Sequence, residues 1–216
     1  MGADLTAPVT LDALAGRLLA LPDGRRRIVA LAGAPGSGKS TAAEALVDRL
    51  NAAQPRIAAL LPMDGYHFDD TLLRALGRHA RKGAPDTFDV GGLAAMLARL
   101  RADDEDEIVA PVFDRDIEIA RAGARVIPRS ARIIVCEGNY LLLDRAPWSA
   151  LAPLFDLTVM IEVPEEELRR RLTRRWEGYR LPPEEIRRKL DAVDLPNART
   201  VQRESRAADL RLVERD

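Results

Sequence analysis

One octapeptide constrains the fold of this chain more than any other segment, because it matches the phosphate-binding loop pattern G-x-x-x-x-G-K-[ST] in full. The apolar run 27–32 before it predicts a buried strand, and residues 41–50 after it predict a helix. In that context, backbone amides at a helix N-terminus cradle the phosphates of a nucleotide. The predicted nucleotide-binding residues are Gly33, Ala34, Pro35, Gly36, Ser37, Gly38, Lys39, Ser40 and Thr41.

Two side chains of the loop have specific roles in such a site. The Lys39 ammonium would pair with the outer phosphates, and the Ser40 hydroxyl would help to hold Mg²⁺. We therefore expect ATP and Mg²⁺ as cofactors. The alternative, a glycine-rich turn with a chance lysine, does not explain the strand before the loop and the helix after it.

Composition limits the remaining possibilities. The 216 residues suffice for a single domain, residues 1–216, and the net charge of −1 from 33 basic and 34 acidic residues argues against nucleic acid as a partner. Cys136 is the only cysteine, and no apolar run is long enough for a signal peptide or a membrane span. We expect a cytoplasmic protein without membrane insertion, and a homodimer stays open.

Apolar runs predict an α/β fold of the P-loop NTPase type, with five parallel strands flanked by helices. A helix capped by Thr10 is expected to run through Leu21 before the strands begin. Because helical patterns separate most of the strands, ligands are expected at the carboxyl ends of the strands. The strand-like runs are 27–32, 57–61, 133–136, 158–163 and 210–213.

A long segment between the second and third of these strands exceeds the length of a simple crossover. Residues 65–131 are therefore interpreted as a substrate-binding insertion. Its pattern predicts helices at 71–76 and 90–101 and strand-like pieces at 108–112 and 124–127. The acidic tract 103–107 is interpreted as a solvated turn and not as a cation site.

Two carboxylates come directly after strands of the predicted sheet. Asp64 comes after the second strand, where it would face the γ-phosphate and accept a proton from an attacking hydroxyl. Glu137 comes after the third strand, at a position suited to hydrated Mg²⁺. Each could instead be a turn carboxylate beside a glycine. Together with the loop, they favour a phosphotransferase.

Four strings in this order resemble the phosphoribulokinase and uridine kinase family of P-loop kinases: MDGYH at 63–67, RKGAPDTFD at 81–89, PVFDR at 111–115 and EGNYLL at 137–142. Within that family the chain is most similar to bacterial proteins described as fructose transport system kinases, with pantothenate and uridine kinases as relatives. The resemblance implies that Asp64 is the catalytic aspartate, that Glu137 belongs to the metal site, and that the insertion binds a small-molecule acceptor.

The acceptor itself stays open. Uridine kinases have a tyrosine and a histidine where this chain has Phe113-Asp114-Arg115, and pantothenate kinases differ around Glu137 and in the segment after it. Asp114 and Arg115 are interpreted either as ligands of sugar hydroxyls or a phosphate, or as a structural pair. The candidate acceptor-binding residues are Asp64, His67, Arg81, Lys82, Asp114, Arg115, Asn139 and Tyr140.

Residues 164–190 are expected to form a lid. Acidic residues 165–167 favour a helix start, and arginines crowd positions 169–175. Because successive helical positions lie about 100° apart, these arginines cannot share one face, and some would reach the transferring phosphoryl group. Arg171, Arg174 and Arg175 are the candidates for a catalytic role. The alternative is a solvated face whose arginines pair with Glu165, Glu166 and Glu167.

The sequence thus favours an ATP-dependent kinase that phosphorylates an alcohol group of a sugar-like or nucleoside-like metabolite. A nucleotide-dependent switch or hydrolase is a second hypothesis, although the N-K-x-D motif of GTPases is missing. A nucleic-acid-dependent ATPase is a third, against which the near-neutral charge argues.

Overall fold

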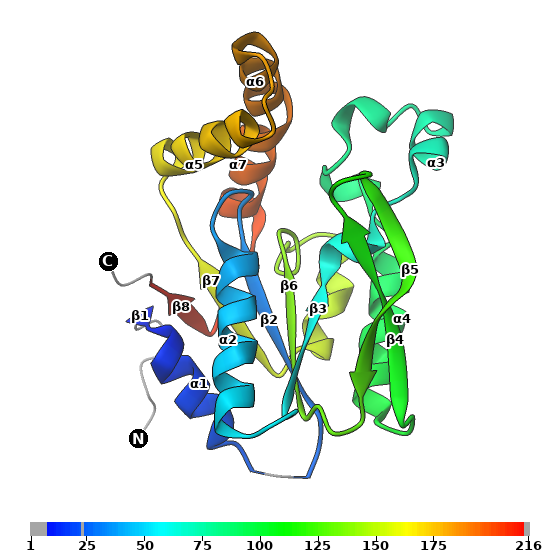
Figure 1. Cartoon of the computed structure of the whole chain (residues 1–216), viewed down its shortest axis with the longest axis vertical. Coiled ribbons are helices and arrows are strands. Elements are labelled where there is room, and N and C mark those ends of the chain that lie inside the picture. The colour runs from blue at the N-terminus through cyan, green and yellow to red at the C-terminus, as the bar shows by residue number, and fades with distance from the viewer. Residues whose placement is uncertain (1–7, 23, 214–216) are drawn as a thin grey trace.

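A parallel sheet of six strands forms the centre of the described part of the chain, which comprises residues 8–22 and 24–213 of a computed structural model. The strand order is β1-β8-β7-β2-β6-β3 (Figure 1). The interior strands β2 and β6 are buried almost throughout, as expected for parallel strands covered on both faces. The bounds are β1 Pro8–Val9, β2 Arg27–Gly33, β3 Ala58–Pro62, β6 Ile133–Gly138, β7 Leu157–Ile161 and β8 Leu210–Leu212.

The α/β class and the parallel sheet predicted from the apolar runs are confirmed, but the number of five strands is wrong. The additional strand is β1, which pairs in parallel with β8 at the edge of the sheet. β1 has only two residues, so it carries no periodic signal, and only the free edge of β8 gives it a partner.

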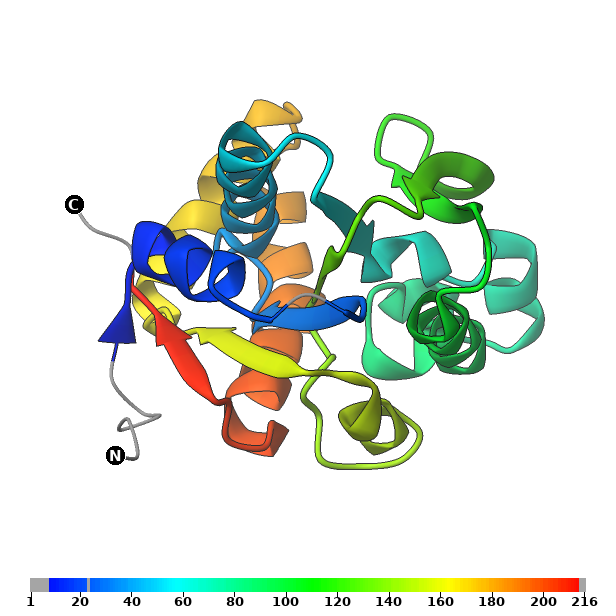
Figure 2. The same cartoon turned by 90° about the horizontal axis from the view of Figure 1, so that it is seen from below.

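Helices cover both faces of the sheet (Figure 2). α1 (Leu11–Leu19) and α2 (Lys39–Ala53) pack together on one face, and the 3₁₀ segment Trp148–Leu154 lies on the other side with α7 (Leu195–Glu204). Thr10 caps α1 as predicted, because its hydroxyl accepts a hydrogen bond from Ala13 N at 3.3 Å.

The segment between β3 and β6 forms a lobe beside the sheet. It contains α3 (Asp70–Ala75), α4 (Val90–Ala102) and an antiparallel pair, β4 (Glu107–Asp114) and β5 (Ile119–Pro128). Short 3₁₀ turns at Met63–Tyr66, His79–Arg81 and Pro85–Thr87 connect these elements. The turns lie at the end of the lobe nearest the carboxyl ends of the strands, where they can reach a ligand of the phosphate loop.

A buried arginine attaches this lobe to the sheet. The side chain of Arg26 has no solvent exposure and forms an ion pair with Asp103 at 3.2 Å. Asp103 also pairs with Arg132. The interpretation of 103–107 as a wholly solvated tract is therefore wrong for Asp103, because two arginines distant in sequence compensate its charge. Glu105, by contrast, pairs with Arg99 at the surface.

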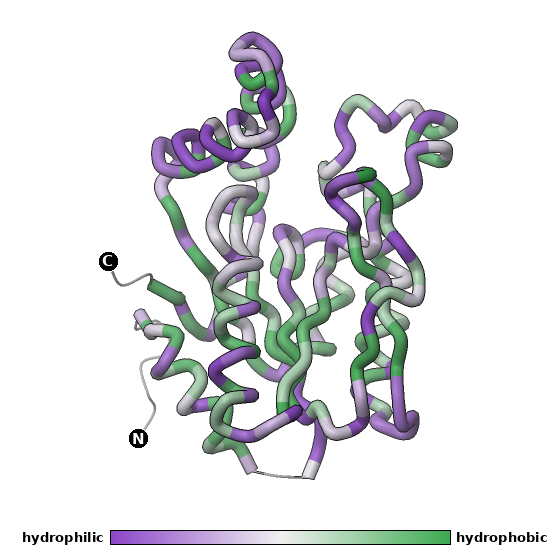
Figure 3. The backbone as a smooth tube through the Cα atoms, viewed as in Figure 1, coloured by the Kyte–Doolittle hydropathy of each residue, from purple (hydrophilic) through white to green (hydrophobic). Residues whose placement is uncertain are grey.

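A helical arm lies above the phosphate loop. It consists of α5 (Glu165–Gly178), α6 (Pro183–Lys189), a π-helical turn (Leu190–Asp194) and then α7. Figure 3 shows that α5 is largely hydrophilic, whereas the central strands are hydrophobic. The arm covers nearly all of the segment 164–190, which is expected from the sequence to form a lid. Among the described residues, no helix combines the length and the apolar character that a bilayer span requires.

Candidate active site

The phosphate loop has the backbone geometry that its glycines permit. It connects the end of β2 at Gly33 to the start of α2 at Lys39, and Gly36 and Gly38 have φ angles of 80° and 84°, in the left-handed region. A Cβ on Gly33 would lie 2.5 Å from Ser37 Oγ. The loop is therefore a tight turn ahead of a helix N-terminus, which is the arrangement that binds phosphate groups.

Sheet topology brings the two predicted carboxylates next to this loop. Glu137 pairs in register with Leu31 of β2 on one side and with Pro62 of β3 on the other. Asp64 lies just beyond the end of β3, in the 3₁₀ turn Met63–Tyr66. Because all three parallel strands end at the same edge, Lys39, Asp64 and Glu137 are near enough to influence each other electrostatically.

Burial and the neighbouring charges together shift the pKa values of this trio. Burial lowers the pKa of Lys39, against the opposing effect of Glu137 and Asp64. Burial also raises the pKa of Glu137 to about 7, although Lys39 and a hydrogen bond from Ser40 oppose this. Burial alone would raise the pKa of Asp64 too, but His67, Arg115 and Lys39 around it lower it instead. Asp64 is consequently a carboxylate that stays ionised.

The residues around Glu137 fit a magnesium ion bound together with a nucleotide. Glu137 is 5% exposed, and the Ser40 hydroxyl hydrogen-bonds to its carboxylate, so two oxygen ligands meet beside the loop. Within residues 8–22 and 24–213, no cluster of three or more His, Cys, Asp or Glu side chains could hold a metal by itself. Mg²⁺ commonly takes only one or two carboxylates and completes its shell with phosphate and water.

A cavity of about 610 Å³ opens beside Lys39 and Asp64. The lobe forms one wall with His67, Lys82, Phe113 and Arg115 among its residues, and the helical arm forms the opposite wall. The arm contributes Arg175, Trp176, Arg188, Lys189, Asp194 and Asn197 to the cavity lining. One space therefore connects the phosphate loop, the carboxylate of Asp64 and the lobe.

Five predicted acceptor-binding residues line this cavity: Asp64, His67, Lys82, Arg115 and Asn139. Arg115 Nη2 donates to Asp64 Oδ2 at 2.6 Å. The ring of His67 contacts the rings of Phe88 and Phe113 at tilted angles, and its Nδ1 is 2.8 Å from the carbonyl oxygen of Asp64. Because a carbonyl only accepts hydrogen bonds, Nδ1 is the protonated nitrogen of this histidine.

Asn139 gives an independent indication of a ligand. It lines the cavity, and its side-chain oxygen is buried without a hydrogen-bond partner. Buried polar atoms in folded proteins are nearly always paired, so this oxygen is suited to accept a hydrogen bond from a bound molecule.

Three other predicted acceptor-binding residues lie outside this cavity. Arg81 pairs with Asp86 at 2.6 Å and lines a different surface hollow. Asp114 accepts a hydrogen bond from Arg121 at 2.8 Å within the β4–β5 hairpin. Tyr140 is fully buried, and its hydroxyl donates to the carbonyl oxygen of Gly83 at 2.6 Å. The first two are engaged in ion pairs, and the third supports the loop that carries Lys82.

The lid arginines take different positions. Arg175 lines the cavity and stacks on Trp176 at 5.5 Å. Arg171 pairs with Glu167 at 2.7 Å, and its Nη1 lies 3.4 Å from the carbonyl oxygen of Ser37 in the phosphate loop. Arg174 is exposed and does not line the cavity. The alternative of a solvated face thus describes part of the helix.

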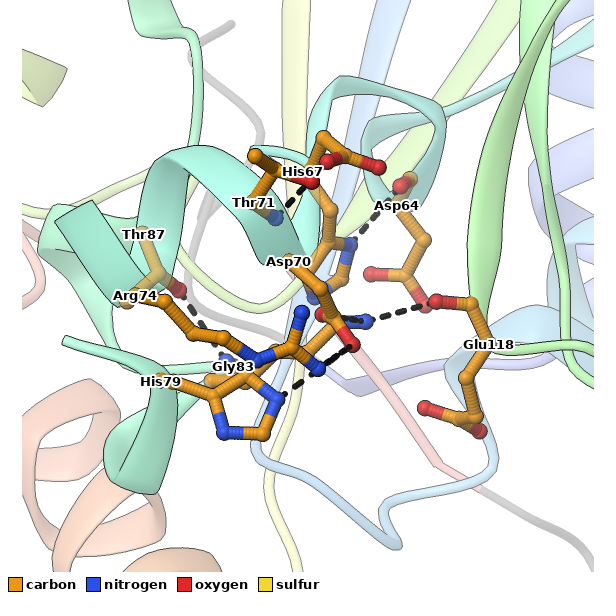
Figure 4. A network of polar contacts seen from close by, with 11 residues as sticks. Asp64, His67, Asp70, Thr71, Arg74, His79, Gly83, Thr87 and Glu118 are labelled. Carbon is orange, nitrogen blue, oxygen red and sulfur yellow. Dashed lines mark hydrogen bonds and ion pairs between the residues drawn. The ribbon is translucent and has the colours of Figure 1, made fainter.

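Sequence reasoning missed several cavity residues, namely Asp70, His79, Glu118, Trp176, Arg188, Lys189, Asp194 and Asn197. Figure 4 shows how Asp70, His79, Arg74 and Glu118 join one polar network. Asp70 accepts a hydrogen bond from Lys82 at 2.7 Å, and the ammonium of Lys82 also donates to the carbonyl oxygen of Glu118 at 2.6 Å.

Comparison with protein families gives one match over most of the chain. The model of the family described as "Phosphoribulokinase / Uridine kinase family" matches residues 28–180. This range includes the phosphate loop, Asp64, the lobe, Glu137 and α5.

Several individual proteins are similar to this chain over most of its length. "Uncharacterized protein YggC" of Escherichia coli (strain K12) is 35% identical over 188 residues, which cover 86% of this chain and 77% of that protein. "Putative uridine kinase C227.14" of Schizosaccharomyces pombe is 31% identical over 196 residues, covering 86% and 82%. The crystal structure of a "putative fructose transport system kinase" from Silicibacter sp. TM1040 has 39% identity, a TM-score of 0.87, and coverage of 94% of this chain and 98% of that one.

Proposed function

This chain belongs to the phosphoribulokinase / uridine kinase family and is an ATP-dependent small-molecule kinase, and from that premise we propose that its acceptor is a sugar-like metabolite with several hydroxyl groups. One observation carries the proposal: Asp64 and Lys39 line the same cavity, and this cavity continues along a lobe wall of mixed polar groups.

The charges of the lobe wall favour an uncharged polar acceptor. Its carboxylates are Asp64, Asp70 and Glu118, and its full positive charges are Lys82 and Arg115, so the wall has no surplus of cations for an anionic ligand. Alternating donors and acceptors suit a molecule whose hydroxyl groups do both. The arm wall is different, because Arg175, Arg188 and Lys189 outnumber Asp194 there and suit the phosphates of ATP.

A second cavity, of about 570 Å³, is suited to the base of the donor nucleotide. It borders the phosphate loop at Ala34, away from the lobe, and includes Val163, Pro164, Val201 and the segment 205–208. A largely apolar lining with a few polar groups is typical of sites that bind small molecules. ATP in this position would present its terminal phosphate to the large cavity.

The residues of the site support an in-line transfer. Asp64 orients the acceptor hydroxyl and takes its proton as the oxygen attacks the terminal phosphorus of ATP, and ADP leaves. Lys39 neutralises the phosphates during transfer, and Arg175 is the arm residue best placed to assist it. Mg²⁺, held by Ser40 and Glu137, would neutralise phosphate charge when it is bound with the nucleotide.

The test is an acceptor panel. The full chain is incubated with ATP and Mg²⁺ and with D-fructose, other sugars, sugar alcohols, uridine or pantothenate, and ADP release is compared with a control lacking acceptor. A sugar or sugar alcohol should stimulate ADP release most strongly. Stimulation only by uridine or pantothenate would contradict the acceptor class. ATP hydrolysis that no acceptor changes would favour the switch or hydrolase hypothesis.

A pair of matched variants tests the role of Asp64. Asp64→Asn should lower kcat by about 10²–10⁴-fold, the usual contribution of a general base, with little change in nucleotide affinity. Asp114→Asn, which changes a carboxylate outside the cavity, should leave kcat within about threefold of the wild type, as expected away from the reacting atoms. Equal rates for wild type and Asp64→Asn would contradict the assignment of the base.

A further inference from the structure

We propose that Asn197 is a positioning residue that connects the helical arm to the loop carrying Lys82, so that nucleotide binding at the phosphate loop orders the acceptor wall. The proposal rests on the proposed function, because it assumes that nucleotide binds at the loop and acceptor at the lobe. It goes beyond that function by naming the contact through which the two halves of the site communicate.

The contact is the carbonyl oxygen of Gly83, which accepts two hydrogen bonds. One comes from the Tyr140 hydroxyl at 2.6 Å, and the other from Asn197 Nδ2 at 3.3 Å. Tyr140 belongs to the core just beyond β6, whereas Asn197 belongs to α7 and is 8% exposed. A carbonyl oxygen has two lone pairs, so Gly83 joins the core and the arm through a fully used acceptor.

Hydrogen bonds within the loop around Gly83 hold residues 79–87 together. Gly83 N donates to the hydroxyl of Thr87 at 3.0 Å, and this hydroxyl donates to the carbonyl oxygen of Ala84 at 2.7 Å. Lys82 N donates to the carbonyl oxygen of His79 at 3.1 Å. Figure 4 shows Gly83 and Thr87 beside the polar network of the lobe. A displacement of Gly83 therefore displaces Lys82, whose ammonium faces the cavity.

Within the arm, Asn197 of α7 is connected to α5. α6, the π-helical turn and α7 come one after another without a break, and Asp194 stands one helical turn before Asn197. Trp176 of α5 donates its indole N–H to Asp194 Oδ2 at 2.7 Å, and Lys189 lies 4.6 Å from the Trp176 ring. The end of α5 and the residue just before α7 are thus joined by a partly buried hydrogen bond.

The arm also contacts the phosphate loop directly. The side chain of Leu172 in α5 lies 2.9 Å from the position that a Cβ on Gly36 would occupy. Arg171 lies 3.4 Å from the carbonyl oxygen of Ser37. A nucleotide that orders the phosphate loop would therefore stabilise α5, and through Trp176, Asp194 and Asn197 it would stabilise the loop at Gly83.

Hydrogen exchange measured by mass spectrometry tests this connection without an acceptor. The full chain is measured with and without a non-hydrolysable ATP analogue and Mg²⁺. In the wild type, the analogue should slow exchange in residues 165–194 and also in residues 79–87, by about 5-fold or more, the lower range of coupling between sites. Asn197→Asp keeps the shape but loses the donor, and Asn197→Ala is the second variant. Both should lose protection of 79–87 and keep it in 165–194.

Tyr140→Phe is the matched control, because it removes the other donor to Gly83 and leaves the link to the arm. Its residues 79–87 should still be protected when the analogue binds. The proposal is refuted if the wild type shows no protection at 79–87 despite protection at 165–194, or if both Asn197 variants retain it. Absence of protection at 33–41 in the wild type would instead contradict nucleotide binding itself and refute the proposed function.

Discussion

The replacement Arg26→Met should strongly destabilise the fold. Arg26 donates to three backbone carbonyl oxygens: Nε to Ala131 at 2.9 Å, Nη1 to Leu100 at 3.2 Å and Nη2 to Pro128 at 3.3 Å. Methionine preserves the apolar stem and removes every donor. The carbonyls of Ala131 and Leu100 then lose a buried hydrogen bond, Pro128 O keeps only its bond from Ala131 N, and Asp103 retains only Arg132.

The magnitude can be worked out from these contacts. Each hydrogen bond from a charged donor contributes about 1.5–3 kcal/mol, and such terms are not additive within one side chain. Breaking a buried ion pair by removing one partner costs about 3–5 kcal/mol, which we take as the expected loss of unfolding free energy. For a domain of this size, 1 kcal/mol corresponds to about 2–4 °C, so Tm should fall by about 6–20 °C.

Urea unfolding monitored by circular dichroism measures this loss, with a common m-value for wild type and variants. Arg25→Met is the control, because the neighbouring Arg25 is 51% exposed and pairs with Asp156 at 2.6 Å. Because Arg25 is half-exposed and the Asp156 side chain, itself 9% exposed, keeps Arg101 at 3.4 Å and Ile28 N at 2.8 Å as partners, losing this pair should cost about 1 kcal/mol or less. If Arg26→Met loses no more than Arg25→Met, the assignment of Arg26 as the attachment of the lobe is refuted.

Further predictions concern residues of the site. Lys39→Ala should lower kcat by at least about 10²-fold in the ADP-release assay, because the phosphates lose their buried cation, and an unchanged kcat would contradict its role. Gly65→Ala should lower the unfolding free energy by about 1–3 kcal/mol in thermal unfolding, because the added Cβ would lie 2.4 Å from the carbonyl oxygen of Pro111. An unchanged unfolding free energy would show that the backbone adapts. Burial lowers the pKa of His67 from its usual 6.5, so the unfolded chain binds more protons than the folded chain at low pH. The unfolding free energy of the wild type should therefore fall relative to that of His67→Gln as the pH falls below 6.5. A relative gain in unfolding free energy would contradict this sign.

Local sequence was sufficient to predict the phosphate loop and the strand and helix on either side of it. The phosphate loop depends on neighbouring residues and on two glycines with positive φ, so its pattern carries its geometry. The positions of Asp64 and Glu137 beside this loop could be predicted because parallel strands end at one edge of the sheet, although β6 extends to Gly138 and therefore includes Glu137 instead of ending before it. Most of the predicted strands and helices also lie close to their observed bounds, because the apolar patterns that predict them are short-range.

The acceptor half depends on contacts between distant residues. Arg115 and Asp64 are 51 positions apart, and Asn197 and Gly83 are 114 apart. Tyr140 is a candidate acceptor-binding residue by sequence, and the structure shows its hydroxyl donating to the carbonyl oxygen of Gly83, 57 residues away. The two-residue strand β1 exists only because β8 offers a free edge.

The sequence by itself determined the class of sheet, the phosphate loop and the positions of the two carboxylates, because each depends on residues that are neighbours in the chain. Only the tertiary structure decided which polar side chains face the cavity and which hold the lobe in place. The physical reason is that an arginine, tyrosine or asparagine serves equally well as a ligand or as a buried hydrogen-bond donor, and the partner that folding places beside it determines which role it has.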